Sequence, residues 1–312
     1  ISFKVDRSSI RQGNAVIAIK DVSDAILWSW HVWVTDEDIN NVIEITNHQN
    51  VKYNFMPVNL GQCDGNTITY EERSCKVKFI AGDQSKEITI KQLANVIATG
   101  SNAPFYQWGR KDPLYPSNGM GNTTKIWYDK EGIPSTANPM KGTFSAGNDC
   151  IKNCILNPNL MHNRYNGDYT YYNLWSADNK TTSANDNPVN KTIYDPCPVG
   201  FKLPASNAFT GFTTTGESVS SSTQVNGTWS SSEKGWYFYT NSEKTQSIFF
   251  PALGYRSYST MRPGSIGTQG CFWSAHPVAK GNNYYLRTSS VDVQPTYMVD
   301  RGFGYALRPC QD

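Results

Sequence analysis

The sequence predicts an α+β fold that is rich in β-strands and has long loops. Three observations lead to this class. Apolar residues alternate along several segments, helical periodicity is confined to two short segments, and the chain is 13% aromatic but only 17% charged. Alternation is typical of half-buried strands, whereas a helix repeats its apolar face every 3.6 residues. Abundant Asn, Ser, Thr, Gly and Tyr are typical of extracellular proteins built from strands and loops.

The first 93 residues are predicted to be all β. Segments 14–21 and 25–36 alternate most clearly between apolar and polar residues. Segment 75–93 is predicted to be a hairpin, because two alternating runs flank the turn pair Gly82-Asp83. The region should therefore consist of antiparallel strands joined by short turns.

Residues 94–193 show little periodicity and are rich in Asn, Pro, Gly and aromatic residues. The exception is segment 148–157, where apolar residues four apart predict a helix. The remainder is predicted to form long structured loops. We expect Trp108, Trp127 and Trp175 to pack within these loops, because they would otherwise be exposed.

Residues 194–312 return to regular patterns. Segment 194–212 places Cys197 between two prolines, which fix φ and forbid a helix at that point. A short helix capped near Ser206 is predicted to follow, with Phe209 and Phe212 on one face. Short strands are then predicted at 228–240, 245–253, 270–277, 283–295 and 303–310.

The size and charge of the chain limit the number of its domains and the kinds of partner it can bind. Its 312 residues allow one large or two ordinary domains, and we divide it into a β region at 1–95 and a larger domain at 96–312. The strands that begin near residues 25 and 54 fit either part. The net charge of +2, from 28 basic and 26 acidic residues, gives no basic footprint for nucleic acid. No apolar run reaches the roughly 18–20 residues that span a bilayer.

Several motifs occur in a fixed order along the chain. They are "WSWHVWVTD" (28–36), "NFMPVNLG" (54–61), "FYQWGRKDP" (105–113), "CPVGFKLP" (197–204), "WSSS" (229–232), "CFWSA" (271–275), "YYLR" (284–287) and "GYALRPC" (304–310). In this order they resemble the Fibrobacter succinogenes major paralogous domain of Bacteroidota surface proteins, over roughly residues 25–312. That resemblance implies a C-type-lectin-like domain with long loops, preceded by a small antiparallel β region. It also implies a fimbrillin-family or fimbrial-tip-like role.

The resemblance also implies one disulfide, between Cys197 and Cys310, which would close the two ends of the larger domain. By loop entropy, so long a closure adds about 4–5 kcal/mol to the free energy of unfolding. A second bridge, between Cys63 and Cys75, is predicted because these residues flank a short polar loop. The alternative for this pair is two buried thiols.

The other cysteines give a weaker signal. Cys150 and Cys154 are four apart on the predicted helix, a spacing that suits a disulfide poorly, so we expect small buried apolar residues. No CxxC spacing occurs among the seven cysteines, which disfavours zinc ribbons and thioredoxin chemistry. Cysteines in this number favour an oxidising compartment.

No cofactor is predicted, although calcium has one candidate segment. Residues 183–190, "SANDNPVN", offer the side-chain oxygens of Asn185, Asp186 and Asn187, which are ligands that calcium prefers. The same residues are also common in ordinary turns, and we favour a turn over a calcium site. The tripeptides with which calcium-dependent lectins bind sugar do not occur.

Catalytic signatures do not occur either. The chain has no nucleophile elbow, zinc-protease, phosphate-loop or dinucleotide motif. The histidines at 31, 48, 162 and 276 show no ligand spacing, so structural roles are expected. A glycosidase pair of carboxylates stays open, because acidic residues are plentiful.

Aromatic residues next to small polar residues give the best signal for binding. Tyr255, Arg256, Tyr258 and Arg262 lie in one polar loop, and Trp236 lies in an aromatic strand. Tyr, Trp and Arg are enriched where proteins bind partners. We therefore predict that these five residues form a recognition patch.

The sequence as a whole predicts a non-enzymatic, adhesin-like or fimbrial-tip-like binding module that recognises a protein or a glycan. The partner is expected to be a host or neighbouring-cell molecule, or a pilus subunit, and not nucleic acid. An alternative is a structural subunit of a surface assembly that pairs through its N-terminal strands. A carbohydrate-processing enzyme is a weaker alternative. The expected location is extracellular, at the outer-membrane surface, as a lipoprotein or exported product whose targeting segment is absent here.

Overall fold

A computed structural model gives the fold of the chain. It describes all residues except 1–3, 5, 11, 64–67, 98–102, 116–126, 129–132, 136–141, 144–146, 163–172, 179, 181–182 and 279–280. The described part is 42% strand and 8% helix, which confirms that the protein is β-rich. No helix in it is long and apolar enough to cross a membrane.

The predicted α+β, C-type-lectin-like fold is wrong. The described residues contain one α-helix, α1 (Gly147–Leu156), and three short 3-10 helices, η1 (Arg7–Ser9), η2 (Ser206–Phe212) and η3 (Ser222–Gln224). The short helix predicted after Cys197 forms as the 3-10 helix η2, although its N-cap is Ala205 and not Ser206. Phe209 and Phe212 fit a 3-10 helix well, because residues three apart eclipse each other at three residues per turn.

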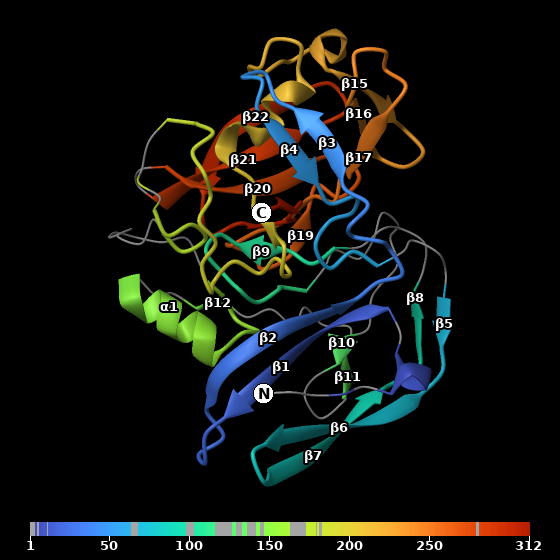
Figure 1. Ribbon diagram of the computed structural model, residues 1–312, viewed down its shortest axis with the longest axis vertical. Helices are drawn as coiled ribbons and strands as arrows, with labels where there is room; N and C mark the ends of the chain where they lie inside the picture. The colour runs from blue at the N-terminus through green and yellow to red at the C-terminus, as the bar shows by residue number, and fades with distance from the viewer. Residues whose placement is uncertain are drawn as a thin grey trace.

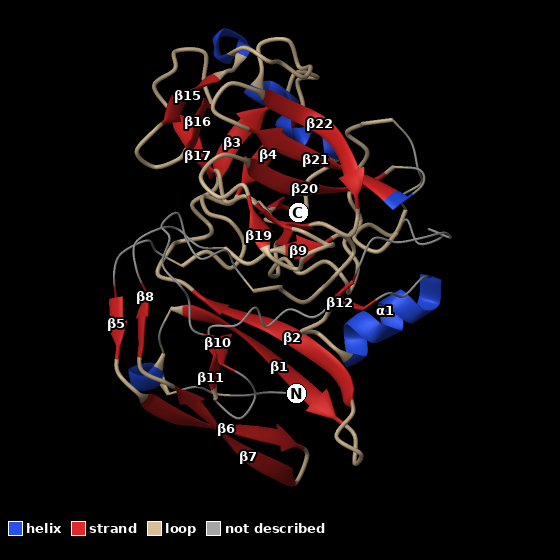
Figure 2. Ribbon diagram, turned by 180° about the vertical axis from the view of Figure 1, so that it is seen from behind, coloured by secondary structure: helices blue, strands red, loops and turns tan. Residues whose placement is uncertain are grey.

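A group of two-stranded sheets lies at one end of the molecule and is called here the hairpin region (Figures 1 and 2). Its pairs are β1 with β2, β5 with β8, β6 with β7, and β10 with β11, all antiparallel. Its strands are β1 (Gly13–Lys20), β2 (Ile26–Val34), β5 (Ile68–Tyr70), β6 (Arg73–Ala81), β7 (Gln84–Gln92), β8 (Asn95–Ile97), β10 (Trp127–Tyr128) and β11 (Pro134–Ser135).

The other end of the molecule contains four larger sheets and is called here the sheet region (Figures 1 and 2). Their strand orders are β14-β24-β4-β3, β15-β16-β17, β19-β18-β23-β9 and β20-β21-β22. The strands are β3 (Ile43–Thr46), β4 (Lys52–Phe55), β9 (Tyr106–Gln107), β14 (Phe201–Lys202), β15 (Gly227–Ser230), β16 (Gly235–Tyr239), β17 (Ser247–Pro251), β18 (Tyr255–Arg256), β19 (Pro263–Gly264), β20 (Gly270–Pro277), β21 (Asn282–Thr288), β22 (Val293–Asp300), β23 (Gly304–Tyr305) and β24 (Cys310–Gln311).

The chain passes between the two regions more than once. After β2 it enters the sheet region, where β3 pairs with β4, and β4 pairs with the C-terminal strand β24 through Phe55 and Cys310. It then returns to the hairpin region for β5 to β8 before it leaves again at β9. The early strands near residue 54 therefore belong to the sheet region.

Two of the predicted hairpin features are confirmed. β6 and β7 pair in register from Arg73 with Gln92 to Ala81 with Gln84. Gly82 occupies the turn with φ +60°, a conformation that glycine adopts without strain. The alternating segment 25–36 forms β2, which pairs with β1.

The core of the sheet region is largely aromatic. The rings of Phe212 and Phe238 stack with centroids 3.9 Å apart, and Phe250 packs edge-on against both. A second cluster contains Trp108 and Trp175, both buried as predicted. Trp127 is in β10, but its side chain lies outside the described residues.

Helix α1 lies at the side of the molecule, beside β2 (Figures 1 and 2). It confirms the helix predicted at 148–157 to within one residue. Next to it, β12 (Gly142–Thr143) and β13 (Met161–His162) form a short parallel pair. This arrangement brings His162 close to the helix.

Candidate functional site

The predicted recognition patch is not a continuous surface. Trp236 and Arg256 are each only 1% exposed, Tyr255 and Tyr258 are half-buried, and Arg262 alone is exposed. Trp236 packs in the aromatic core and donates its indole N–H to the Ser289 carbonyl at 2.6 Å. The prediction that Trp236 and Arg256 contact a ligand is therefore wrong.

Arg256 holds its own loop together from within. Its guanidinium donates to the Met261 carbonyl at 2.7 Å and to the Tyr115 carbonyl at 2.8 and 3.1 Å. Burial lowers the pKa of this guanidinium to about 10. A buried arginine of this kind is a structural brace, because its donors satisfy carbonyl groups that water cannot reach.

Neither predicted disulfide is formed. Cys197 and Cys310 are buried thiols, and burial raises the pKa of each. The ends of the sheet region are joined by pairing of β14 with β24, in which Lys202 lies opposite Cys310. Cys63 and Cys75 are also unbridged, and residues 64–67 between them lie outside the described residues.

Hydrogen bonds from two charged side chains, and not a disulfide, hold the proline-rich segment around Cys197 in position. The Lys191 ammonium donates to the carbonyls of Cys197, Pro198 and Phe201 at 2.6 to 2.9 Å. The Asp195 carboxylate accepts the Cys197 N–H at 2.8 Å. Proline rigidity and these bonds together fix the extended entry to η2.

The candidate calcium segment has a structural role. One oxygen of Asp186 accepts from Asn47 at 2.6 Å and from Tyr53 at 2.7 Å, and the other accepts from Asn207 at 2.9 Å. Asn185 accepts the N–H of Asn187, an ordinary Asx turn. A calcium ion at Asp186 would have to displace these donors.

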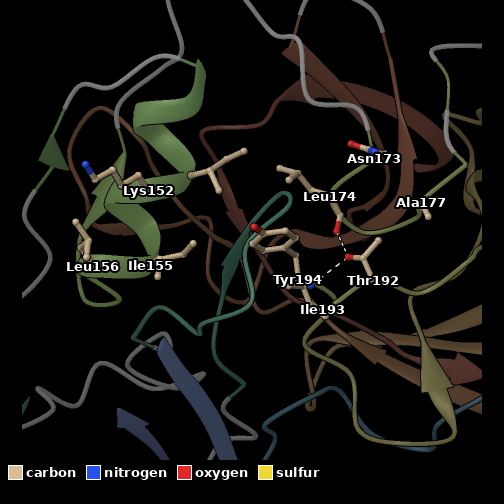
Figure 3. Close-up of a pocket in the computed structure, with 10 residues that line it drawn as sticks. Lys152, Ile155, Leu156, Asn173, Leu174, Ala177, Thr192, Ile193 and Tyr194 are labelled. Atoms are coloured by element: carbon tan, nitrogen blue, oxygen red, sulfur yellow. Dashed lines mark hydrogen bonds between the residues drawn. The ribbon is translucent and has the colours of Figure 1, made fainter. Parts of the chain in front are cut away.

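One cavity lies beside α1, far along the chain from the predicted patch. It has a volume of about 570 Å³ and is called here the α1 pocket. Figure 3 shows side chains of the helix on one side and those of two loop segments on the other. Its lining residues are Ile151, Lys152, Ile155, Leu156, Asn173, Leu174, Ala177, Thr192, Ile193 and Tyr194.

Helix periodicity creates one wall of the α1 pocket. Ile151 and Ile155 are four residues apart and share the helix face that lines the cavity. On the opposite wall the Thr192 hydroxyl donates to the Leu174 carbonyl and accepts the Tyr194 N–H at 3.1 Å (Figure 3). These bonds hold the loop wall in a fixed shape.

A smaller cavity adjoins the α1 pocket and shares Ile151, Ile155, Leu174 and Tyr194 with it. Its lining includes Cys150 and Cys154, and the segment from Gln107 to Asp112. The two sulfur atoms and a ring nitrogen of His162 all lie within 4.8 Å of one another. These three residues are called here the thiol–imidazole cluster.

The surroundings of the cluster favour the thiolate form of Cys154. A hydrogen bond with Cys150 is the largest factor that holds the pKa of Cys154 well below its ordinary value. The positive charge of Arg110 and the neighbouring His162 act in the same direction. A thiolate is both the nucleophilic and the metal-binding form of cysteine.

Arg110 is fixed beside the cluster by backbone oxygens. Its guanidinium donates to the carbonyls of Leu160 and Pro158, and more weakly to that of Asn157 at 3.4 Å. These acceptors come from the connection between α1 and β13. The same connection leads directly to His162. The bonds of Arg110 therefore fix its own positive charge beside the cluster and also hold the segment that carries the imidazole.

A buried ion pair ties the wall of the smaller cavity to the hairpin region. The Lys111 ammonium lies 2.7 Å from Asp112 and donates to the Ser29 carbonyl of β2 at 2.9 Å. The Ser29 hydroxyl donates to Asp112 at 2.8 Å. Ser29 is buried although it lies in an exposed hairpin, because this network covers it.

Comparison with known proteins gave no match: no family model, no curated protein and no solved structure is similar to this chain. The resemblance to the Fibrobacter succinogenes major paralogous domain stays a prediction carried by its motifs alone.

Sequence reasoning missed the α1 pocket and the role of His162. The i, i+4 spacing of the two cysteines and of two isoleucines on one predicted helix was the available signal. It placed Cys150 and Cys154 on one face. It could not place His162 there, because the strands that position this residue are two residues long and have no periodicity.

Proposed function

We propose that this protein is a non-enzymatic binding module of the cell surface, adhesin-like or fimbrial-tip-like, whose ligand site is the α1 pocket. The observation that carries the proposal is the pocket itself. Its volume of about 570 Å³ lies in the range of ligand sites, and most of its lining side chains are apolar. It is bounded by a helix on one side and a hydrogen-bonded loop on the other, which supports a preformed site.

The chemistry of the lining favours an apolar segment of a partner protein over a glycan. Its apolar members are Ile151, Ile155, Leu156, Leu174, Ala177 and Ile193. Ile193 is 72% exposed, so it leaves apolar surface available at this site. Sugars need a ring of hydrogen-bonding groups. Here the Thr192 hydroxyl is already engaged with the Leu174 carbonyl.

The surface location rests on composition. The chain is poor in charge and rich in Asn, Ser, Thr, Gly and Tyr, a pattern of extracellular β proteins. The cysteines give this location no support, because none of the seven forms a disulfide.

A phage-displayed peptide library tests the proposal. The wild-type protein should select peptides with two or three clustered apolar side chains. Ile155→Glu, which puts a carboxylate into the pocket wall, should select none of them. Ile80→Glu, at an exposed position on β6, is the matched charge change away from the pocket and should behave as wild type. Selection of the same peptides by Ile155→Glu would contradict the proposal.

A specific observation favours a second candidate, a structural subunit that pairs through its N-terminal strands. β1 pairs with β2 on one edge, and no strand in the described part of the chain pairs with its other edge. The strand is eight residues long, and Val16 on it is 40% exposed. An open edge of this length can accept a strand from a neighbour. A photo-crosslinker at Val16 should then give covalent dimers, and absence of crosslinks at high protein concentration would count against this candidate.

A further inference from the structure

The thiol–imidazole cluster unites residues from two separate elements. Helix α1 supplies Cys150 and Cys154 from successive turns, and β13 supplies His162. The hydrogen bonds of Gln107 fix the backbone of His162 from both sides, since its side chain accepts the His162 N–H at 3.0 Å and donates to the His162 carbonyl at 2.8 Å. The three potential ligand atoms lie within 4.8 Å of one another.

His162 is the unusual member of the cluster. Its side chain is 0% exposed, yet neither ring nitrogen has a hydrogen-bond partner of normal geometry among the described residues, although the sulfur atom of Cys154 lies close to the ring. A buried polar group without a partner destabilises the folded state, so such groups are rare in folded proteins. A ligand that accepts an electron pair from the imidazole would satisfy one of the two ring nitrogens.

A disulfide is not an adequate explanation for the cysteine pair. Residues four apart on a helix have Cβ atoms about 5–6 Å apart, whereas a disulfide needs about 3.5–4.5 Å. The bridge would therefore require α1 to unwind. The two sulfur atoms lie near each other but too far apart to form a disulfide. Such a pair can instead bind one metal ion between them.

We propose that Cys150, Cys154 and His162 bind a thiophilic d¹⁰ metal ion, Zn²⁺ or Cu⁺. Two sulfur ligands and one imidazole select these ions, whereas calcium and magnesium require oxygen ligands. The site is independent of the proposed function, although it adjoins the α1 pocket.

The local charges are compatible with a cation. The two thiolates that form on binding carry two negative charges, and Arg110 carries one positive charge beside them. With both thiols deprotonated, these three groups carry one net negative charge. Cu⁺ would neutralise it, and Zn²⁺ would leave one positive charge.

The coordination number separates the two ions as well. Three protein ligands complete a trigonal Cu⁺ site, but Zn²⁺ takes four ligands in tetrahedral geometry. The cavity next to both cysteines has a volume of about 30 Å³, which is room for a water molecule as the fourth ligand.

Metal titration of the reduced protein tests the proposal. Zn²⁺ is added in competition with a chromophoric chelator, and Cu⁺ in a parallel anaerobic titration. The expected result is one equivalent bound by the wild type for at least one of the two ions. Replacement by Co²⁺ should give the sulfur-to-metal charge-transfer absorption of thiolate ligation.

Variants decide which residues bind the ion. Cys154→Ser and His162→Gln should each weaken binding at least 10-fold. Cys75→Ser, a cysteine on β6 outside the cluster, is the matched control and should bind as wild type. Melting curves of the metal-free variants check that each one folds, and His162→Gln serves if Cys154→Ser does not. The proposal is overturned if the wild type binds neither ion, or if the cluster variants bind as tightly as Cys75→Ser.

Discussion

Acidification should destabilise the protein through one buried histidine. His276 in β20 is 2% exposed, and its Nδ1 accepts the Ser206 N–H at 3.2 Å. A nitrogen that accepts a hydrogen bond from an amide cannot also carry a proton. Burial lowers the pKa of His276 from 6.5 to about 4 in the folded protein. Protonation must therefore break the contact that holds the start of η2.

The sign and size of the effect follow from this pKa difference. Between pH 6.5 and pH 4 the unfolded chain binds the proton more strongly than the folded one, so the free energy of unfolding falls as the pH falls. At 1.36 kcal/mol per pKa unit, the roughly 2.5-unit difference removes about 3 kcal/mol by pH 4. The contribution is fully present above pH 6.5.

Urea unfolding at pH 7 and pH 4 measures this loss. His276→Asn places a carboxamide oxygen near the position of Nδ1 and does not titrate, so the variant should lose about 3 kcal/mol less than the wild type between the two pH values. His48→Asn, at an exposed position, is the control and should lose as much as the wild type. Equal losses in the wild type and His276→Asn would refute the reasoning.

Two further predictions concern stability and are measured by urea unfolding at pH 7. Arg308→Ala should lower the free energy of unfolding by about 4 kcal/mol, because the buried guanidinium donates to four separate oxygens; the exposed Arg262→Ala should change it little. Gly211→Ala should cost about 2 kcal/mol, because its Cβ would lie 2.4 Å from the Thr46 carbonyl oxygen. Gly13→Ala, where the new Cβ meets nothing within 4 Å, is the control. Equal effects of either variant and its control would show that the assigned contact is unimportant.

Local patterns in the sequence were sufficient for the elements that depend on local order. The hairpin at 75–93 has an alternating run on each side of a glycine turn, and it forms β6 and β7 as expected. The helix at 148–157 has an i, i+4 apolar pair, and it forms α1. Neither element needed information from distant residues.

The sequence could not predict roles that distant residues decide. Arg256 looks like a surface residue because charged side chains are seldom buried without partners. Its acceptors are backbone carbonyls, which every residue has and which therefore leave no mark in the sequence. His162 meets the two cysteines because β13 pairs with β12 and because the distant Gln107 holds its backbone. The short helix predicted after Cys197 does form, as the 3-10 helix η2, but spacing by three could not distinguish a 3-10 helix from an α-helix.

The most direct test of the proposed binding site is calorimetric titration of the tightest selected peptide against three forms of the protein. The account predicts that Ile155→Glu weakens binding on the order of 100-fold, because a buried carboxylate against an apolar ligand costs a few kcal/mol. Arg262→Ala, in the surface loop first predicted from the sequence, should bind as tightly as the wild type. Loss of binding in Arg262→Ala with normal binding in Ile155→Glu would contradict the account and place the ligand at the 255–262 loop.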